Sequence, residues 1–186
     1  MKSTIICFVA LLVTGTITAQ TEQVSLKIIQ DGKTYLPDKN EIQLQRKPFV
    51  IEVTLQNTPG VFVKADFKDN MYQLKDNEPV PDLKKLFSET MTEENNNKDK
   101  EIAISTEGWS NWSYQPDEKW SSFDKEVKIV NGHTVTGSRT VQQFYTDDRQ
   151  TIKVEEIKTP LYLFFLTTTN DMKSELNRQK IKISWR

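Results

Sequence analysis

The chain has 186 residues, with 25 lysines and arginines against 26 aspartates and glutamates, and a net charge of −1. A chain of this length buries a hydrophobic core without disulfides, and the lack of a block of basic residues argues against nucleic-acid binding. One cysteine and one histidine cannot form an internal disulfide and are too few for a zinc or copper site. The composition therefore predicts no cofactor and no metal.

Residues 1–19 have the pattern of a secretory signal. Lys2 provides a positive start, an apolar run extends from Ile5 to Val13, and small and hydroxylated residues lead to Ala19. The apolar run is less than half of the roughly 20 residues that a membrane span requires. We therefore expect cleavage after Ala19, which leaves Gln20 first and no integral membrane segment.

Cleavage at this point also removes Cys7, the only cysteine. Eukaryotic secreted domains often use disulfides, so a mature chain without thiols favours the bacterial envelope. We expect a periplasmic or secreted protein with one domain over residues 20–186.

Apolar residues at every second position dominate the first half of that domain, which is the pattern of strands with one buried face. Asp31-Gly32 predicts a tight turn after the first strand, and residues 57–60 (NTPG) predict a turn that joins two strands into a hairpin. The expected strands cover residues 24–28, 42–44, 49–55 and 61–67.

Residues 76–100 interrupt the strand pattern. Leu83, Leu86 and Phe87 have helical spacing and predict one short helix. Residues 92–100 contain no apolar side chain and predict a solvated loop. Because the residues before this stretch are too few for a stable core of their own, we expect an insertion within a single domain.

Short strands resume after the insertion. Asn131-Gly132 is a strong hairpin signal, Gly137 predicts a β-bulge, and residues 161–166 (LYLFFL) are apolar on both faces, as in a central strand covered on both sides. Residues 170–178 are expected as a loop or short helix. The further strands are expected near residues 102–104, 109–120, 127–130, 133–145, 152–154 and 181–185. The fold class is therefore all-β, a mostly antiparallel sandwich or a barrel, with one short helix.

Aromatic residues are densest between Trp109 and Trp120. Indole faces can stack on sugar rings, so Trp109, Trp112, Tyr114 and Trp120 are the candidate ligand-binding residues. The alternative is that these rings pack in the core or between sheets. Because Trp109 and Trp112 are three residues apart, a strand would direct them to opposite faces.

The five residues WSNWS at 109–113 resemble the W-S-x-W-S box of type I cytokine receptors and thrombospondin type 1 repeats. In the receptors the box precedes the last strand of a fibronectin-like domain, and its tryptophans stack with arginines. Here about seventy residues follow the box, and the paired cysteines of both families are missing. We therefore assign the chain to neither family.

No catalytic motif is present. His133, the only histidine, follows the Asn131-Gly132 turn and is expected to be solvated. The acidic pairs at 93–94, 147–148 and 155–156 are adjacent in sequence, so strand geometry directs their carboxylates apart rather than onto one substrate. No calcium loop or glycine-rich phosphate loop occurs.

These observations predict a non-enzymatic binding module of the cell envelope whose partner is a protein or a glycan. Two alternatives stay open. One is a hydrolase of envelope polymers with dispersed carboxylates, and the other is an inhibitor or immunity-type protein that blocks another protein's site. The sequence determines neither the ligand nor the oligomeric state.

Overall fold

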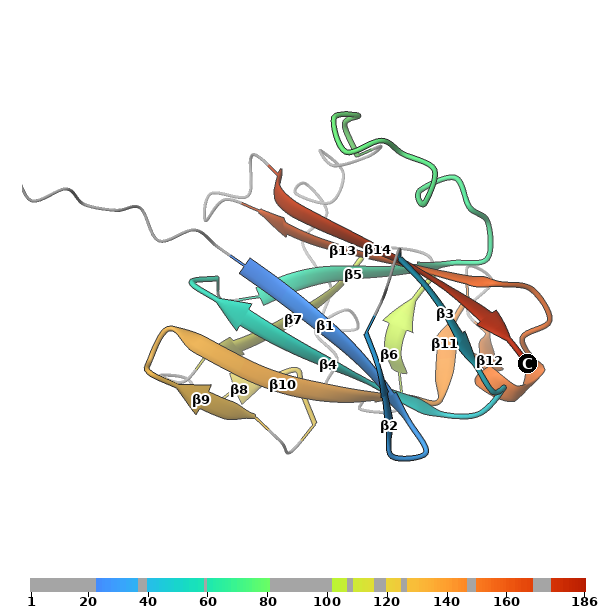
Figure 1. Ribbon diagram of the computed structural model, residues 1–186, viewed down its shortest axis with the longest axis horizontal. Coiled ribbons are helices and arrows are strands. Elements are labelled where there is room, and N and C mark those ends of the chain that lie inside the picture. Colours follow the sequence, from blue (N-terminus) through green and yellow to red (C-terminus); the bar gives the residue numbers. More distant parts are fainter. Residues whose placement is uncertain are drawn as a thin grey trace, which may run out of the picture.

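The computed structural model describes residues 23–36, 40–58, 60–80, 102–106, 109–115, 120–124, 127–146, 150–168 and 175–186. A five-stranded and a six-stranded sheet pack into a mostly antiparallel β-sandwich, and a three-stranded sheet lies near the C-terminal end (Figure 1). The predicted all-β sandwich is therefore confirmed. The predicted signal, the helix near residues 83–87 and the loop at 92–100 lie outside the described residues.

Two tight turns build the edges of the five-stranded sheet. Asp31 and Gly32, with φ of 53° and 73°, connect the first two strands, and Asn131 and Gly132, with φ of 51° and 71°, lie in the second turn. Both predicted turns are confirmed. The strand order is β2 (Lys33–Tyr35), β1 (Gln23–Gln30), β4 (Phe49–Gln56), β10 (Thr134–Val141) and β9 (Lys128–Val130).

The six-stranded sheet has β13 and β5 near its centre. Its order is β3 (Glu41–Leu44), β14 (Glu175–Trp185), β13 (Leu161–Thr168), β5 (Gly60–Asp66), β7 (Ser110–Gln115) and β8 (Trp120–Ser121). The three-stranded sheet contains β12 (Thr151–Lys153), β11 (Gln143–Tyr145) and β6 (Ile102–Ser105), and a 3-10 turn, Val154–Glu156, follows β12. Strands from before and after the insertion pair within both large sheets.

The hairpin predicted between residues 49–55 and 61–67 is wrong. β4 pairs with β1 and β10, whereas β5 pairs with β13 and β7, so the two strands belong to opposite sheets. Asn57, with φ of 57°, takes the left-handed conformation where the chain crosses between them. Two strands of a hairpin and two strands in opposite sheets both bury every second residue. The alternation of apolar residues in the sequence therefore does not distinguish a hairpin from a crossing between sheets.

The bulge predicted at Gly137 is also wrong, because β10 pairs with β4 in an unbroken register through this residue. A Cβ atom at Gly137 would lie 2.3 Å from Cγ of Phe123. The glycine therefore provides room for the ring of Phe123 in the core. The predicted strand 133–145 divides at Gln142 into β10 and β11, which belong to different sheets.

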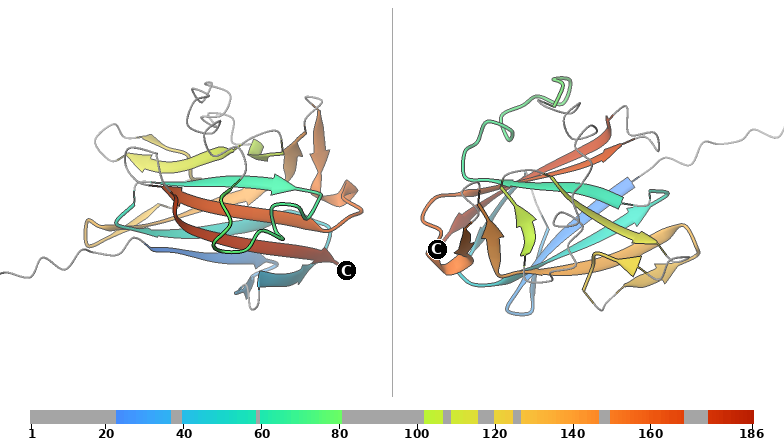
Figure 2. Two further views of the ribbon diagram at one scale, coloured as in Figure 1. Left: turned by 90° about the horizontal axis from the view of Figure 1, so that it is seen from above. Right: turned by 180° about the vertical axis from the view of Figure 1, so that it is seen from behind.

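The central strand β13 is covered on both faces, as predicted. Leu161, Leu163 and Phe165 face the core between the sheets, and Phe164 and Leu166 face outward. The outward side chains form a second cluster, here called the outer cluster, which consists of Phe62, Val80, Trp109, Phe164 and Leu166. A segment without regular structure, residues 67–80, crosses this face over β13 and β14 and is called the strap (Figure 2, left).

The prediction of a loop or helix at residues 170–178 is wrong for its second half. Residues 175–178 are the beginning of β14, which extends over eleven residues to Trp185. Charged and polar residues occupy most of its first half, and apolar residues alternate with polar ones in its second half.

Candidate functional site

The structure separates the candidate tryptophans as strand geometry predicts. Trp112 is completely buried between the two large sheets, whereas Trp109 is 9% exposed and packs against Phe164 in the outer cluster, with ring centroids 5.6 Å apart. Tyr114 is half-buried against the core, and the side chain of Trp120 lies outside the described part. For Trp109 and Trp112 the packing interpretation therefore fits the structure, because neither indole face is open to a sugar.

An arginine from the opposite sheet stacks on the buried indole. The guanidinium carbon of Arg139 lies 5.3 Å from the ring centroid of Trp112, and Arg139 is only 1% exposed. Burial lowers the pKa of Arg139 to about 10, and the nearby carboxylate of Asp124 opposes this shift. Tryptophan–arginine stacking also occurs around the W-S-x-W-S box of cytokine receptors, but here it lies inside the sandwich and is not exposed for binding.

The described structure instead offers an open strand edge. β14 pairs with β13 along one side, but on its other side β3 begins to pair only at Lys182, opposite Glu41. From Glu175 to Ile181 this side has no strand partner among the described residues, and we call it the β14 edge. Asn40, with φ of 62°, immediately precedes β3 at the point where that strand joins the sheet.

The backbone of the β14 edge is oriented for hydrogen bonding. The amide of Arg186 donates to the carbonyl oxygen of Leu44 in β3 over 2.9 Å. Because N–H and C=O groups alternate sides along a strand, the even-numbered residues of β14 direct theirs toward the β3 side. Arg178 and Lys180 therefore present backbone donors and acceptors at the open edge.

A polar hollow of about 470 Å³ extends along this edge. Amide, carboxylate and cationic groups line it, so it provides both hydrogen-bond donors and acceptors. The lining residues are Asn40, Asp76, Glu175, Asn177, Arg178, Gln179, Lys180 and Ile181. Six of these eight belong to β14, so the hollow follows the strand itself.

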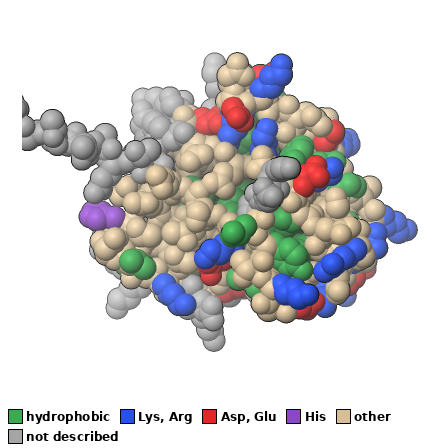
Figure 3. Space-filling model, in the orientation of Figure 1, with side chains coloured by type: hydrophobic (Ala, Val, Ile, Leu, Met, Phe, Trp, Pro, Cys, Tyr) green, Lys and Arg blue, Asp and Glu red, His purple; other side chains and the backbone are tan. Residues whose placement is uncertain are grey.

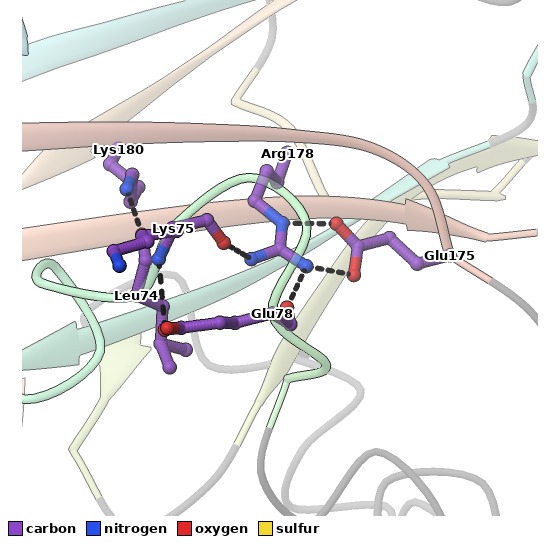
Figure 4. Close-up of polar contacts among 6 residues, drawn as sticks. All are labelled: Leu74, Lys75, Glu78, Glu175, Arg178 and Lys180. Carbon is purple, nitrogen blue, oxygen red and sulfur yellow. Dashed lines mark hydrogen bonds and ion pairs between the residues drawn. The ribbon is translucent and has the colours of Figure 1, made fainter.

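The side chains of Arg178 and Lys180 hold the strap on the outer face. Arg178 donates to the carbonyl oxygens of Lys75, over 2.9 Å, and of Glu78, over 2.7 Å. It also forms a two-pronged ion pair with Glu175 and lies over the ring of Phe164, 5.9 Å from its centroid. Lys180 donates to the carbonyl oxygen of Leu74 (Figure 4). The strap and the β14 edge therefore share the same two residues.

Aromatic and charged groups continue this face toward β3. The ring of Tyr72 lies 5.3 Å from that of Tyr162, and its hydroxyl donates to the carbonyl oxygen of Asn40 over 3.3 Å. Burial raises the pKa of Tyr72, and the negative charge of Glu41 raises it further. A 2.9 Å hydrogen bond to Glu41 raises the pKa of Lys182.

The remaining candidates provide little chemistry. His133 is exposed in its turn, and Glu155 and Glu156 are exposed on the 3-10 turn, while the other two acidic pairs lie outside the described part. Within the described ranges, no three histidine, cysteine or acidic side chains gather as metal ligands. The same ranges contain no helix with the length and apolar character to cross a membrane.

The sequence interpretation missed the β14 edge because residues 170–178 were expected to be a loop or helix. The sequence does contain a pattern that indicates a strand here. Cationic residues at 178, 180 and 182 alternate with Gln179 and Ile181. Comparisons with protein families, with curated proteins and with solved structures find no match to this chain.

Proposed function

We propose that the protein is an exported, non-enzymatic binding module that holds an extended segment of a partner protein along the β14 edge. The observation that carries this proposal is the unpaired stretch Glu175–Ile181 beside the hollow. The partner segment would lie alongside residues 175–181 of β14, next to β3, as an additional strand of the sheet. It would hydrogen-bond to the backbone of Arg178 and Lys180.

A polypeptide suits this site better than a glycan or a second copy of the chain. The β14 edge presents backbone N–H and C=O groups. A peptide in extended conformation has N–H and C=O groups at the same spacing and can therefore pair with them. Two copies paired edge to edge would place Arg178 and Lys180 against each other, and like charges across strands are destabilising. The buried Trp109 and Trp112 offer no stacking surface for sugars.

Selection from a displayed library of random peptides, followed by affinity measurements on the best binder, tests the proposal. Lys180→Pro removes the N–H that faces the edge, whereas Lys180→Ala is the matched control that removes the same side chain and keeps the N–H. We expect Lys180→Pro to bind the peptide about tenfold more weakly than Lys180→Ala, because one hydrogen bond is lost and the proline ring crowds the partner.

Amide hydrogen exchange on the unaltered protein provides a second measurement that does not depend on a proline variant folding. The amides of Arg178 and Lys180 should exchange quickly in the free protein and slowly with the peptide bound. Equal affinities for the two variants, or protection confined to another edge such as β9, would refute the proposal.

The hydrolase alternative has one supporting observation, since Asp76 and Glu175 both line the hollow. However, both carboxylate oxygens of Glu175 accept hydrogen bonds from Arg178. A hydrolase would therefore have to use a carboxylate that is already the ion-pair partner of Arg178. Assays with envelope polysaccharides as substrates would distinguish the alternatives, because hydrolysis that is lost in Asp76→Asn would favour the enzyme.

A further inference from the structure

A group of cations gathers at the end of the sandwich where the chain reaches Arg186. Hydrogen bonds connect the segments that contribute them, because Arg46 donates to the carbonyl oxygen of Ile157 over 3.0 Å and Arg186 donates to the hydroxyl of Tyr35 over 3.5 Å. The cations are Lys33, Arg46, Lys47, Lys158 and Arg186. We call this group of five the basic end.

Few carboxylates balance the basic end. Asp31 lies 2.5 Å from Lys47 and compensates one charge, and Glu155 and Glu156 border the surface on the neighbouring 3-10 turn. Lys33, Arg46, Lys158 and Arg186 are exposed, and none of them forms an ion pair with a carboxylate of the described residues. Among the described residues, five cations against three carboxylates leave an excess of positive charge at this end.

Apolar residues adjoin these cations in the chain, since Tyr35 and Leu36 follow Lys33 closely and Trp185 precedes Arg186. Leu36, which directly follows β2, is 65% exposed, more than any other large hydrophobic residue described. Tyr35 and Trp185 are only partly buried, and the indole N–H of Trp185 donates to the carbonyl oxygen of Thr159 over 2.8 Å. Figure 3 shows hydrophobic side chains on the surface in this view, with Lys and Arg and some Asp and Glu around them.

We propose that the basic end is a docking surface for an anionic lipid bilayer. Phosphate headgroups would pair with the lysines and arginines, and Leu36 would enter the boundary between headgroups and acyl chains. The exposed leucine favours a bilayer over a soluble polyanion. Both can pair with the cations, but only a bilayer has an apolar interior in which Leu36 can be buried. This surface is separate from the β14 edge and does not depend on the peptide-binding proposal.

Co-sedimentation of the whole mature protein with vesicles tests this surface. The probes are vesicles with 30% phosphatidylglycerol in phosphatidylcholine and vesicles of phosphatidylcholine alone, at about 0.05 M and about 0.5 M salt, which screens charge–charge attraction. We expect binding to the anionic vesicles at low salt and at least about tenfold less to neutral vesicles or at high salt.

Two pairs of variants separate the contribution of charge to vesicle binding from the contribution of the apolar side chain. Lys33→Glu should weaken binding to anionic vesicles about tenfold or more, because it reverses a charge at the surface, whereas the control Lys128→Glu on β9 should not. Leu36→Ser should weaken it about fivefold, because it removes the inserted apolar side chain. Its control is Ile129→Ser, which changes a residue that is 51% exposed at the opposite edge of the five-stranded sheet.

The proposal is overturned if the protein binds both kinds of vesicle equally or neither of them. It is also overturned if Lys33→Glu behaves like Lys128→Glu. A loss with Lys33→Glu but none with Leu36→Ser would overturn the insertion of Leu36, because charge alone would then hold the protein on the vesicles.

Discussion

Truncation of Trp112 tests the central packing argument. Its indole is fully buried, with the rings of Phe123 and Phe165 at centroid distances of 6.2 and 6.3 Å and Arg139 over its face. A buried tryptophan removes roughly 150–250 Å² from water. At about 25 cal/mol per Å² this corresponds to about 4–6 kcal/mol, close to the ~3–5 kcal/mol observed for such truncations.

We therefore expect Trp112→Ala to lower the free energy of unfolding by about 4 kcal/mol. Urea denaturation followed by circular dichroism measures this change. Ile129→Ala is the control, because its side chain is 51% exposed and surface changes usually stay within about 0.5 kcal/mol. Since Trp112→Ala removes a large part of a typical domain's stability, Trp112→Phe provides a milder second variant.

A loss below about 0.5 kcal/mol for Trp112→Ala would show that the indole is not in the core. The inter-sheet arrangement of β7, β10 and β13 would then be incorrect, and the glycan-stacking interpretation of this segment would return. A loss for Trp112→Ala much larger than for Ile129→Ala supports the arrangement described here.

Three further predictions concern backbone positions and processing. Gly132→Val should destabilise the protein by about 1 kcal/mol or more, because φ of 71° disfavours a β-branched residue, and an unchanged urea midpoint would contradict the turn. Gly137→Ala should cost about 1–3 kcal/mol because its Cβ would lie 2.3 Å from the Phe123 ring. If that clash is the cause, a smaller side chain in Phe123→Leu should reduce the cost of adding the alanine, and a double-mutant cycle would measure the coupling. N-terminal sequencing of the exported protein should find Gln20 first, and an intact Met1 would contradict the predicted signal.

Local patterns in the sequence determined the fold class and two of the turns. Alternating apolar residues identify strands because one face of each is buried, and Asp31-Gly32 and Asn131-Gly132 are favourable where both residues take positive φ. The apolar run 161–166 likewise predicted a strand covered on both faces. These features depend on neighbours in the chain, so they can be derived without a tertiary structure.

Pairing between distant strands was decided only by the tertiary structure. Residues 49–67 have the alternation of a hairpin and also of two strands that face each other across a core, and only the partners β10 and β13 distinguish them. A glycine within a strand, such as Gly137, suggests a β-bulge. Only the structure shows that Gly137 instead makes room for the ring of Phe123, fourteen residues earlier. Among the described residues the β14 edge is open only because β3 joins at Lys182 and no earlier. The sequence alone therefore determined most of the strands and their buried faces. The free edge and the basic end depend on contacts between segments far apart in the chain, which no local pattern encodes.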